Sequence, residues 1–255
     1  MFVILQVKNI EQKYQAKNGE ITALENISFS LEKGQFMSIV GPSGCGKSTL
    51  LSIIAGLIKP SSGEVLVGGN KIEGVSQQIG YMLQKDNLLE WRNIYQNIIF
   101  GLEIRGMMSA EKINRALSLL ETYGLAEFKY KYPSQLSGGM RQRAALIRTL
   151  AVNPEILLLD EAFSALDYQT RLTVTDDVHR ILKQENKTAL IVSHDIPESI
   201  SMGDKVMVLT GRPAHIKEIL EIKFDMDNPT PLSCRNSPQF SGYFNRIWKE
   251  LQSDE

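Results

Sequence analysis

The chain has 255 residues, of which 43% are hydrophobic and 22% charged, with a formal net charge of −1 and an isoelectric point near 6.4. These values suit one large α/β domain or two small ones, and they exclude a general electrostatic attraction to nucleic acid or an anionic membrane. Residues 1–8 lack the pattern of a secretory signal, and no segment approaches the roughly 18 apolar residues of a membrane span. Two distant cysteines, Cys45 and Cys234, argue against a disulfide framework and fit a reducing compartment.

Alternation of apolar and polar residues predicts β-structure in the N-terminal part of the chain. Residues 3–7 and 27–31 are candidate strands, and a turn follows the second of them. The short apolar run at 36–40 is long enough for a buried strand. Residues 59–70 favour a loop, a short strand and a hairpin turn. We therefore expect an antiparallel subdomain next to the first strand of a buried sheet.

A glycine-rich segment follows the strand at 36–40 and precedes an apolar helix at 50–57. Strand, loop and helix in this order place backbone N–H groups and the positive end of a helix around a polyphosphate. Lys47 would contact the β- and γ-phosphates, and the Ser48 hydroxyl would hold Mg²⁺. The residues expected to bind a nucleoside triphosphate are Gly41, Pro42, Ser43, Gly44, Cys45, Gly46, Lys47, Ser48 and Thr49.

The pattern changes to helical periodicity between about residues 85 and 155. Residues 109–123 begin with a serine cap and carry an apolar stripe, composed of Ile113, Ala116, Leu117 and Leu120. Strand-like runs return at 156–160, 188–193 and 205–210, with a helical pattern between the first two. The chain thus predicts a parallel-sheet core with an antiparallel N-terminal β subdomain and an inserted helical subdomain at about 85–155.

The segment at 136–143 indicates a second anion site. Ser137 can cap the helix that follows it, and Gly138 and Gly139 leave backbone N–H groups uncovered at the start of that helix. One chain therefore carries two phosphate-binding segments.

A third group of polar residues follows the apolar strand at 156–160. Asp160 at the tip of this strand is placed to hold Mg²⁺, directly or through water. Glu161, one residue further along, is a candidate general base that polarises an attacking water.

In the order of these motifs the chain resembles the ATP-binding cassette (ABC) family, the ATPase subunits of ABC transporters, over nearly its whole length. The phosphate loop, the signature at 136–142, the acidic strand at 156–161 and the loop at 164–167 all match. The resemblance implies an α/β P-loop NTPase with the ATP-binding cassette fold. It also implies one ABC ATPase domain over residues 1–255, ending in a tail at about 211–255.

The resemblance implies further roles residue by residue. Gln84 matches the glutamine that contacts Mg²⁺ and the attacking water, and His194 matches the histidine that senses the γ-phosphate. Tyr14 lies where the family places an aromatic ring against adenine. A surface amide, a packing histidine and a surface aromatic are the respective alternatives. The implied catalytic residues are Glu161, His194 and Gln84; the Mg²⁺ ligands are Ser48, Gln84 and Asp160; Tyr14, Ser137, Gly138, Gly139 and Asp167 join the phosphate loop in binding ATP.

The resemblance also implies partners. Two copies would form a head-to-tail homodimer around two ATPs, at the cytoplasmic face of the cell membrane as a peripheral subunit. The segment at 87–92 exposes apolar residues where the family receives an integral membrane permease, although Trp91 could instead pack inside the helical subdomain. An extracytoplasmic solute-binding protein would act indirectly, and no nucleic acid is expected.

The segments at 87–92, 211–216 and 238–248 look most like the nitrate, sulfonate and taurine importer subfamily, with Glu90 as a departure because that subfamily commonly has proline there. We therefore expect an importer ATPase. The alternatives are an exporter ATPase and a soluble non-transport ATPase. Nitrate, alkanesulfonates, taurine and vitamin-precursor pyrimidines all remain open as substrates, because the transported molecule would not touch this subunit.

Overall fold

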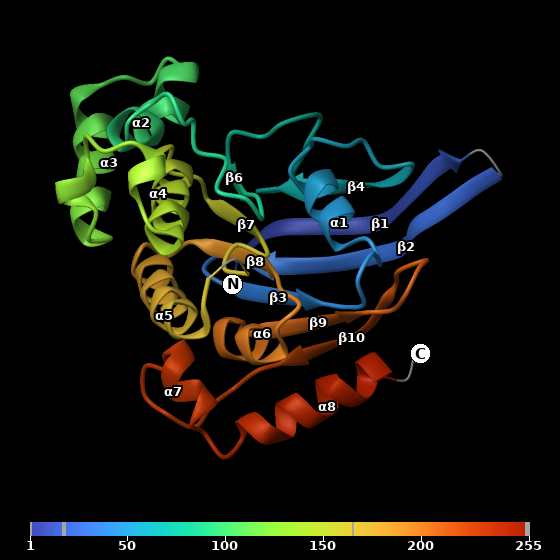
Figure 1. Cartoon of the computed structure of the whole chain (residues 1–255). Helices are drawn as coiled ribbons and strands as arrows, with labels where there is room; N and C mark the ends of the chain where they lie inside the picture. Colours follow the sequence, from blue (N-terminus) through green and yellow to red (C-terminus); the bar gives the residue numbers. More distant parts are fainter. Residues whose placement is uncertain (1, 17–18, 165, 253–255) are drawn as a thin grey trace.

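In the computed structural model, which describes residues 2–16, 19–164 and 166–252, two β-sheets lie together with helices packed around them (Figure 1). The smaller sheet is antiparallel, with the strand order β2-β1-β4-β5. Its strands are β1 (Val3–Ala16), β2 (Gly19–Glu32), β4 (Ser62–Val67) and β5 (Asn70–Lys71). This sheet is the antiparallel N-terminal unit that the alternating pattern predicts.

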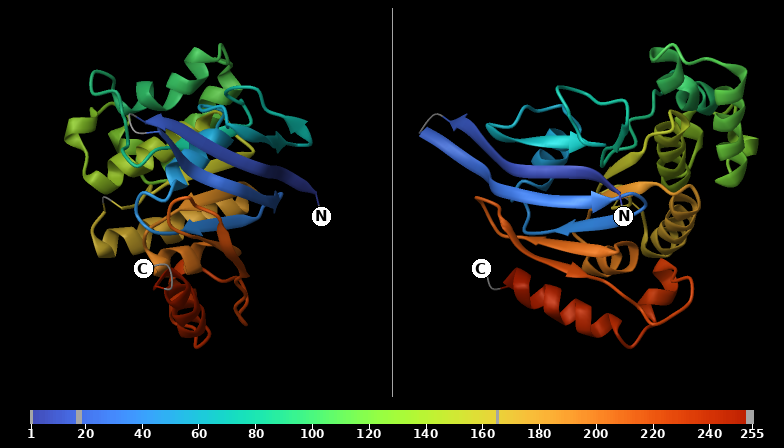
Figure 2. Two further views of the ribbon diagram at one scale, coloured as in Figure 1. Left: turned by 90° about the vertical axis from the view of Figure 1, so that its right-hand side faces the viewer. Right: turned by 180° about the vertical axis from the view of Figure 1, so that it is seen from behind.

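The first two strands are longer than the sequence pattern indicates. The β1–β2 pairing continues from Tyr14↔Ile21 to Ala16↔Gly19, although most of these residues are exposed. Backbone hydrogen bonds between adjacent strands need no apolar face, so hydrophobic alternation marks only the buried part of such a hairpin. The hairpin extends away from the rest of the molecule (Figure 2).

The larger sheet has six strands in the order β10-β9-β3-β8-β7-β6. All adjacent pairs are parallel except β10 with β9. The strands are β3 (Phe36–Val40), β6 (Ile79–Met82), β7 (Ile156–Asp160), β8 (Thr188–Val192), β9 (Lys205–Leu209) and β10 (Ile216–Glu221). Every residue of β3, β7 and β8 is buried, which explains why these strands are nearly continuous apolar runs.

Three helices form a lobe at the upper left of Figure 1, and α1 (Lys47–Ile54) lies apart from them, on the other side of β7. The lobe contains α2 (Ile94–Ile104), α3 (Ala110–Thr122) and α4 (Gly138–Ala151), with short 3₁₀ turns at Ala126–Phe128 and Pro133–Gln135. Ser109 caps α3, as predicted. In α3, Ala116 and Leu120 are buried, but Leu119 takes the place expected for Ile113 and Leu117, which are only partly buried, because α3 turns a slightly different face to α4.

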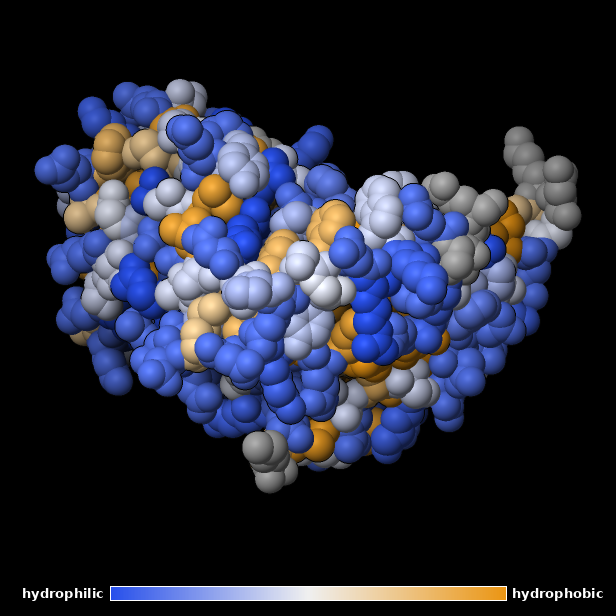
Figure 3. Space-filling view, turned by 90° about the horizontal axis from the view of Figure 1, so that it is seen from below, coloured by the Kyte–Doolittle hydropathy of each residue, from blue (hydrophilic) through white to orange (hydrophobic). Residues whose placement is uncertain are grey.

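The remaining helices are α5 (Tyr168–Gln184), α6 (Ile196–Met202), α7 (Pro231–Arg235) and α8 (Phe240–Gln252). The buried Ile247 of α8 packs in an apolar cluster with Val206 and Val208 of β9 and Ile200 of α6. The face on the side of α7 and α8 is mostly hydrophilic, with apolar residues in small separate groups (Figure 3). Among the helices of the described residues, none is long and apolar enough to cross a membrane.

The parallel arrangement positions the predicted site. The carboxyl ends of β3, β6, β7 and β8 open at the same edge of the sheet, where ligands bind in open α/β folds. The phosphate loop follows β3, Gln84 follows β6, Glu161 follows β7 and His194 follows β8.

Candidate active site

The phosphate loop at 41–46 connects β3 to the first residue of α1. Gly46 precedes the helix with φ 121°, and a Cβ atom there would lie 2.8 Å from the Leu24 side chain. A Cβ on Gly41 would lie 3.1 Å from Cys45 Sγ. A side chain would clash at Gly46 and would be crowded at Gly41, so glycine at both positions allows the close curvature that a polyphosphate requires.

Lys47 crosses this loop. Its Nζ donates to the carbonyl oxygens of Gly41 at 2.7 Å and Pro42 at 2.9 Å, and the residue is only 8% exposed. Ser43, Gly44 and Ser48 remain exposed beside it. The segment therefore combines a held ammonium group with the N-terminal N–H groups of α1 on an accessible surface, which fits a triphosphate.

Asp160 lies beside the start of α1 and accepts two hydroxyl hydrogen bonds. Ser48 Oγ donates to Oδ1 and Tyr81 OH donates to Oδ2, both at 3.2 Å. Burial raises the pKa of the Asp160 carboxyl above its usual range, and burial also raises the pKa of Tyr81 to about 12. Hydroxyl and carboxylate oxygens are the hard donors that Mg²⁺ prefers, so Ser48 and Asp160 fit this ion.

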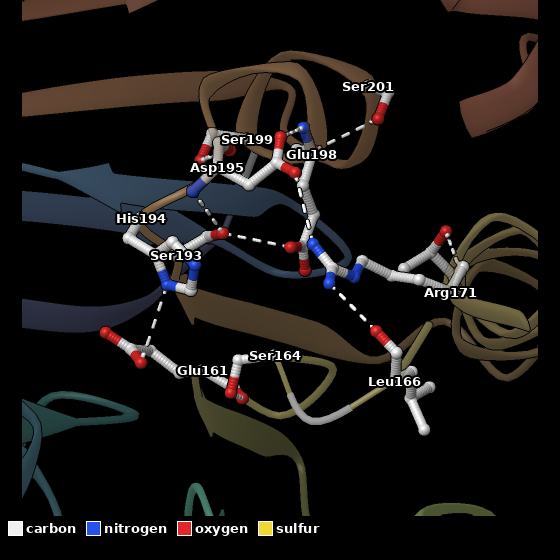
Figure 4. Close-up of polar contacts among 11 residues, drawn as sticks. Glu161, Ser164, Leu166, Arg171, Ser193, His194, Asp195, Glu198, Ser199 and Ser201 are labelled. Atoms are coloured by element: carbon white, nitrogen blue, oxygen red, sulfur yellow. Dashed lines mark hydrogen bonds and ion pairs between the residues drawn. The ribbon is translucent and has the colours of Figure 1, made fainter. Parts of the chain in front are cut away.

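Glu161 is the meeting point of the proposed catalytic residues. Gln84 Nε2 donates to Glu161 Oε2 at 2.9 Å, and His194 Nδ1 lies 3.5 Å from the same oxygen. In Figure 4 the side chains of Glu161 and His194 point toward one another. Glu161 has φ 47°, a left-handed conformation that costs a non-glycine residue about 1 kcal/mol and that often marks functional sites. The structure thus brings together all three residues for which the sequence predicts catalytic roles.

Tyr14 extends from the β1–β2 hairpin toward α1. Its hydroxyl donates to Thr49 Oγ1 at 3.5 Å, and the residue is 39% exposed. The ring therefore lies near the phosphate loop and keeps an accessible surface, as a base-stacking residue requires. Its contact with adenine stays a prediction.

The serine cap that the sequence predicts at the start of α4 is present. Ser137 caps α4 by accepting a hydrogen bond from the Met140 N–H at 3.4 Å. A Cβ on Gly138 would meet open space, whereas a Cβ on Gly139 would lie 2.9 Å from Thr170 Cγ2. Since α4 and α1 lie on different sides of β7 in Figure 1, the two segments that are predicted to bind phosphate lie at separate places in one chain.

The loop at 164–167 connects Glu161 to α5, and Ala165 within it lies outside the described residues. Asp167 is exposed and caps α5 by accepting a hydrogen bond from the Thr170 N–H at 3.0 Å, which lowers the pKa of its carboxyl. Ser164 Oγ donates to the Glu161 carbonyl at 2.9 Å. A contact between Asp167 and nucleotide stays a prediction.

Several polar residues around the site were not found from the sequence. Tyr81 reaches Asp160 because β6 pairs with β7, and Gln142 of α4 donates to the Gln84 carbonyl at 3.5 Å. Arg148 of α4 donates to the Asp86 and Asn87 carbonyls, both at 2.7 Å. No local sequence pattern predicts contacts between segments that are so distant in the chain.

Comparisons with known proteins agree with this geometry. The family model described as ABC transporter matches residues 24–164. The chain is 48% identical to the uncharacterized ABC transporter ATP-binding protein YtlC of Bacillus subtilis, over 98% of this chain and 96% of the relative. It is 36% identical to the nitrate import ATP-binding protein NrtD of Synechocystis, over 98% of this chain and 96% of the relative.

A solved structure, the dimeric post-hydrolysis state of the ATP-binding cassette MJ0796 bound to ADP and Pi, matches with a TM-score of 0.75 at 31% identity. This match covers 86% of the present chain and 99% of that chain. The fold is therefore that of the ATP-binding cassettes, as the motifs imply. The chain belongs to the ABC transporter family, in which it is an ATP-binding ATPase subunit similar to those of the nitrate importer group.

Proposed function

We propose that this chain is the ATP-hydrolysing subunit of an ABC importer. Two copies dimerise around two ATPs and drive uptake of a small solute, such as nitrate, a sulfonate or taurine, through a membrane permease. The observation that carries the proposal is the convergence of Gln84 and His194 on one carboxylate oxygen of Glu161.

The residues at the carboxyl ends of the parallel strands have separate roles in the proposed reaction. Lys47 and the backbone of the phosphate loop bind the triphosphate, while Ser48, Asp160 and Gln84 hold Mg²⁺, which neutralises phosphate charge when bound. Glu161 accepts a proton from the attacking water. Because the amide nitrogen of Gln84 donates to Glu161, its carbonyl oxygen is the group that binds a cation or water.

The dimer follows from the separation of the two phosphate-binding segments. In a two-fold pair, each ATP lies on the phosphate loop of one copy and at the Ser137–Gly139 helix start of the other. Triphosphate contacts then favour the closed pair, and hydrolysis removes them. The similar MJ0796 cassette was solved as a dimer with ADP and Pi, which supports this arrangement.

The permease surface is proposed to lie beside Gln84. A hollow of about 670 Å³ is lined by residues 84–88, Glu90, Arg141, Gln142 and Ser164, but not by Trp91. Trp91 is 74% exposed and does not pack inside the helical lobe. Large exposed aromatic side chains are typical of protein interfaces. A permease helix in this hollow would contact Gln84 and the residues that follow it directly. The extracytoplasmic solute-binding protein would lie on the other side of the membrane.

The test is a pull-down with tagged Glu161→Gln protein and Mg-ATP from detergent-solubilised native membranes, followed by protein identification. We expect a multi-span permease, because this variant is designed to retain ATP without consuming it. The matched control carries the additional change Lys47→Ala and should lose ATP-dependent recovery. Recovery of soluble proteins or nucleic acid alone would overturn the importer proposal.

A further inference from the structure

Arg171, on the first turn of α5, contacts two loops of the site at once. One terminal nitrogen donates to the Leu166 carbonyl at 2.9 Å, and the other lies 3.4 Å from Asp195 Oδ2. Figure 4 shows this side chain reaching from α5 between the loop that follows Glu161 and the loop that carries His194. The guanidinium group therefore joins two segments that are about thirty residues apart in the chain.

The residues on both sides of His194 are held by a closed set of hydrogen bonds. The Asp195 N–H donates to Ser193 Oγ at 3.0 Å, and Ser193 Oγ donates to Glu198 Oε2 at 2.9 Å. The Glu198 N–H donates back to Asp195 Oδ1 at 2.9 Å. Asp195 thus belongs to this set through one carboxylate oxygen and to the Arg171 ion pair through the other.

His194 itself has a 56% exposed side chain, whose Nδ1 lies 3.5 Å from Glu161 Oε2. Its backbone position is accordingly fixed by Ser193 and Asp195 more than by packing of the ring. A displacement of Asp195 would therefore move His194 relative to Glu161.

The other end of Arg171 reaches the loop at 164–167. Leu166 is buried, and the next residue, Asp167, is exposed and caps α5. Arg171 is therefore the side chain through which a movement of that loop reaches Asp195.

We propose that Arg171 is a positioning residue that couples the loop at 164–167 to the segment carrying His194, and thereby keeps His194 in place relative to Glu161. This inference rests on the proposed ATP hydrolysis. An arginine suits the task because its planar fork donates to two acceptors in fixed directions, which a lysine ammonium does not do.

The test compares Arg171→Met, Arg171→Lys and the control Arg180→Met. Arg180 lies on the same helix and pairs with Asp177 at the exposed surface. Hydrogen–deuterium exchange of the nucleotide-free full chain should show faster exchange in both peptides, 164–168 and 193–199, for Arg171→Met, and in neither peptide for Arg180→Met. Arg171→Lys should keep the pairing with Asp195, so that exchange rises mainly in the 164–168 peptide.

Steady-state kinetics provide the second readout. For Arg171→Met we expect kcat to fall on the order of 10-fold, because small misplacements of catalytic groups carry penalties of this size. The Kd for ATP should stay within about two-fold, since Arg171 donates to Leu166 and pairs with Asp195 rather than with the phosphate loop. Arg171→Lys should recover part of kcat.

Equal exchange in both peptides for Arg171→Met and the parent would overturn the coupling, as would a kcat that is unchanged in correctly folded protein. If the parent chain hydrolyses no ATP, the proposed function fails. The exchange experiment still tests the coupling in that case, so the two failures are distinguishable.

Discussion

Tyr81 donates its hydroxyl hydrogen to Asp160 Oδ2 at 3.2 Å across the β6–β7 pair, on the side of the carboxylate opposite to Ser48. One oxygen of Asp160 is thus oriented by a tyrosine while the other meets the hydroxyl that is proposed to share its Mg²⁺. Partners of this kind fix the direction of a metal ligand.

The change Tyr81→Phe should weaken Mg²⁺ binding. We expect the Mg²⁺ concentration for half-maximal ATP hydrolysis to rise about 10-fold, the usual effect of losing a partner of a metal ligand. Titration of activity with Mg²⁺ at saturating ATP measures this. Tyr132→Phe, at an exposed tyrosine, should leave the titration unchanged. Identical titration curves for Tyr81→Phe and the parent would remove Tyr81 from this role.

The change Glu161→Gln should preserve ATP binding and lower turnover by about 10²–10⁴-fold, the usual contribution of a general base. The amide keeps the size of the side chain and an oxygen that accepts from Gln84, but it cannot take a proton. Single-turnover hydrolysis together with equilibrium ATP binding separates the two effects. Glu90→Gln serves as a control outside the Gln84–Glu161–His194 group. A Glu161→Gln protein that hydrolyses ATP at the parental rate would contradict the assignment.

Gly138 and Gly139 are neighbouring positions at which the same substitution to alanine should affect stability differently. Gly139→Ala places a methyl group 2.9 Å from Thr170 Cγ2 and should destabilise the fold by about 1–2 kcal/mol through overpacking between α4 and α5. In Gly138→Ala the added methyl group points into open space, so the free energy of unfolding should stay unchanged or rise slightly. Urea unfolding of both variants measures this difference.

Gly138→Ala then tests the dimer. If this surface approaches the ATP of a second copy, the added methyl group should impair ATP-dependent dimerisation of the Glu161→Gln protein without affecting its fold. Sedimentation with and without Mg-ATP provides the readout. Full dimerisation of the Gly138→Ala double variant would place the interface elsewhere.

Glu198 should make stability depend on pH. The pKa of this carboxyl is raised from 4.5 to about 7, mainly because the residue is buried at 4% exposure. The Ser193 hydroxyl and the charges of Arg171 and Arg235 oppose this rise, and the charge of Asp195 adds to it. The folded chain therefore binds more protons than the unfolded chain between these pKa values. Stability from this group is complete below the lower pKa and is lost as the pH rises through the higher one.

In Glu198→Gln this loss is absent because the amide does not ionise. The free energy of unfolding of the variant, relative to the parent, should therefore increase by on the order of 2 kcal/mol from about pH 5 to about pH 7.5. Urea unfolding across this range measures the difference, and Glu127→Gln at an exposed site is the control. Parallel pH profiles for Glu198→Gln and the parent would show that Glu198 does not titrate in this range.

The sequence could predict those structural features that depend on residues close together in the chain, such as buried strands and helix caps. The continuous apolar runs at 36–40 and 156–160 became buried strands, and the Ser137 cap formed, because each depends on neighbouring residues. The contacts of Tyr81 and Arg171 depend on which strands and loops become neighbours in space. A side chain that bridges distant segments leaves no periodic signal, so the order of the six strands had to be known first.

The two surfaces predicted to contact the phosphates and the base of a nucleotide have different physical properties. Lys47 is buried across a loop anchored in the main sheet, whereas Tyr14 is a part-exposed ring on a hairpin that extends from the smaller sheet. Stacking on such a ring accepts any purine or pyrimidine with modest differences in energy. If Tyr14 is the base-stacking residue, the site should discriminate weakly between adenine and guanine, and the nucleotide hydrolysed in a cell would follow the relative abundance of the nucleoside triphosphates around the protein.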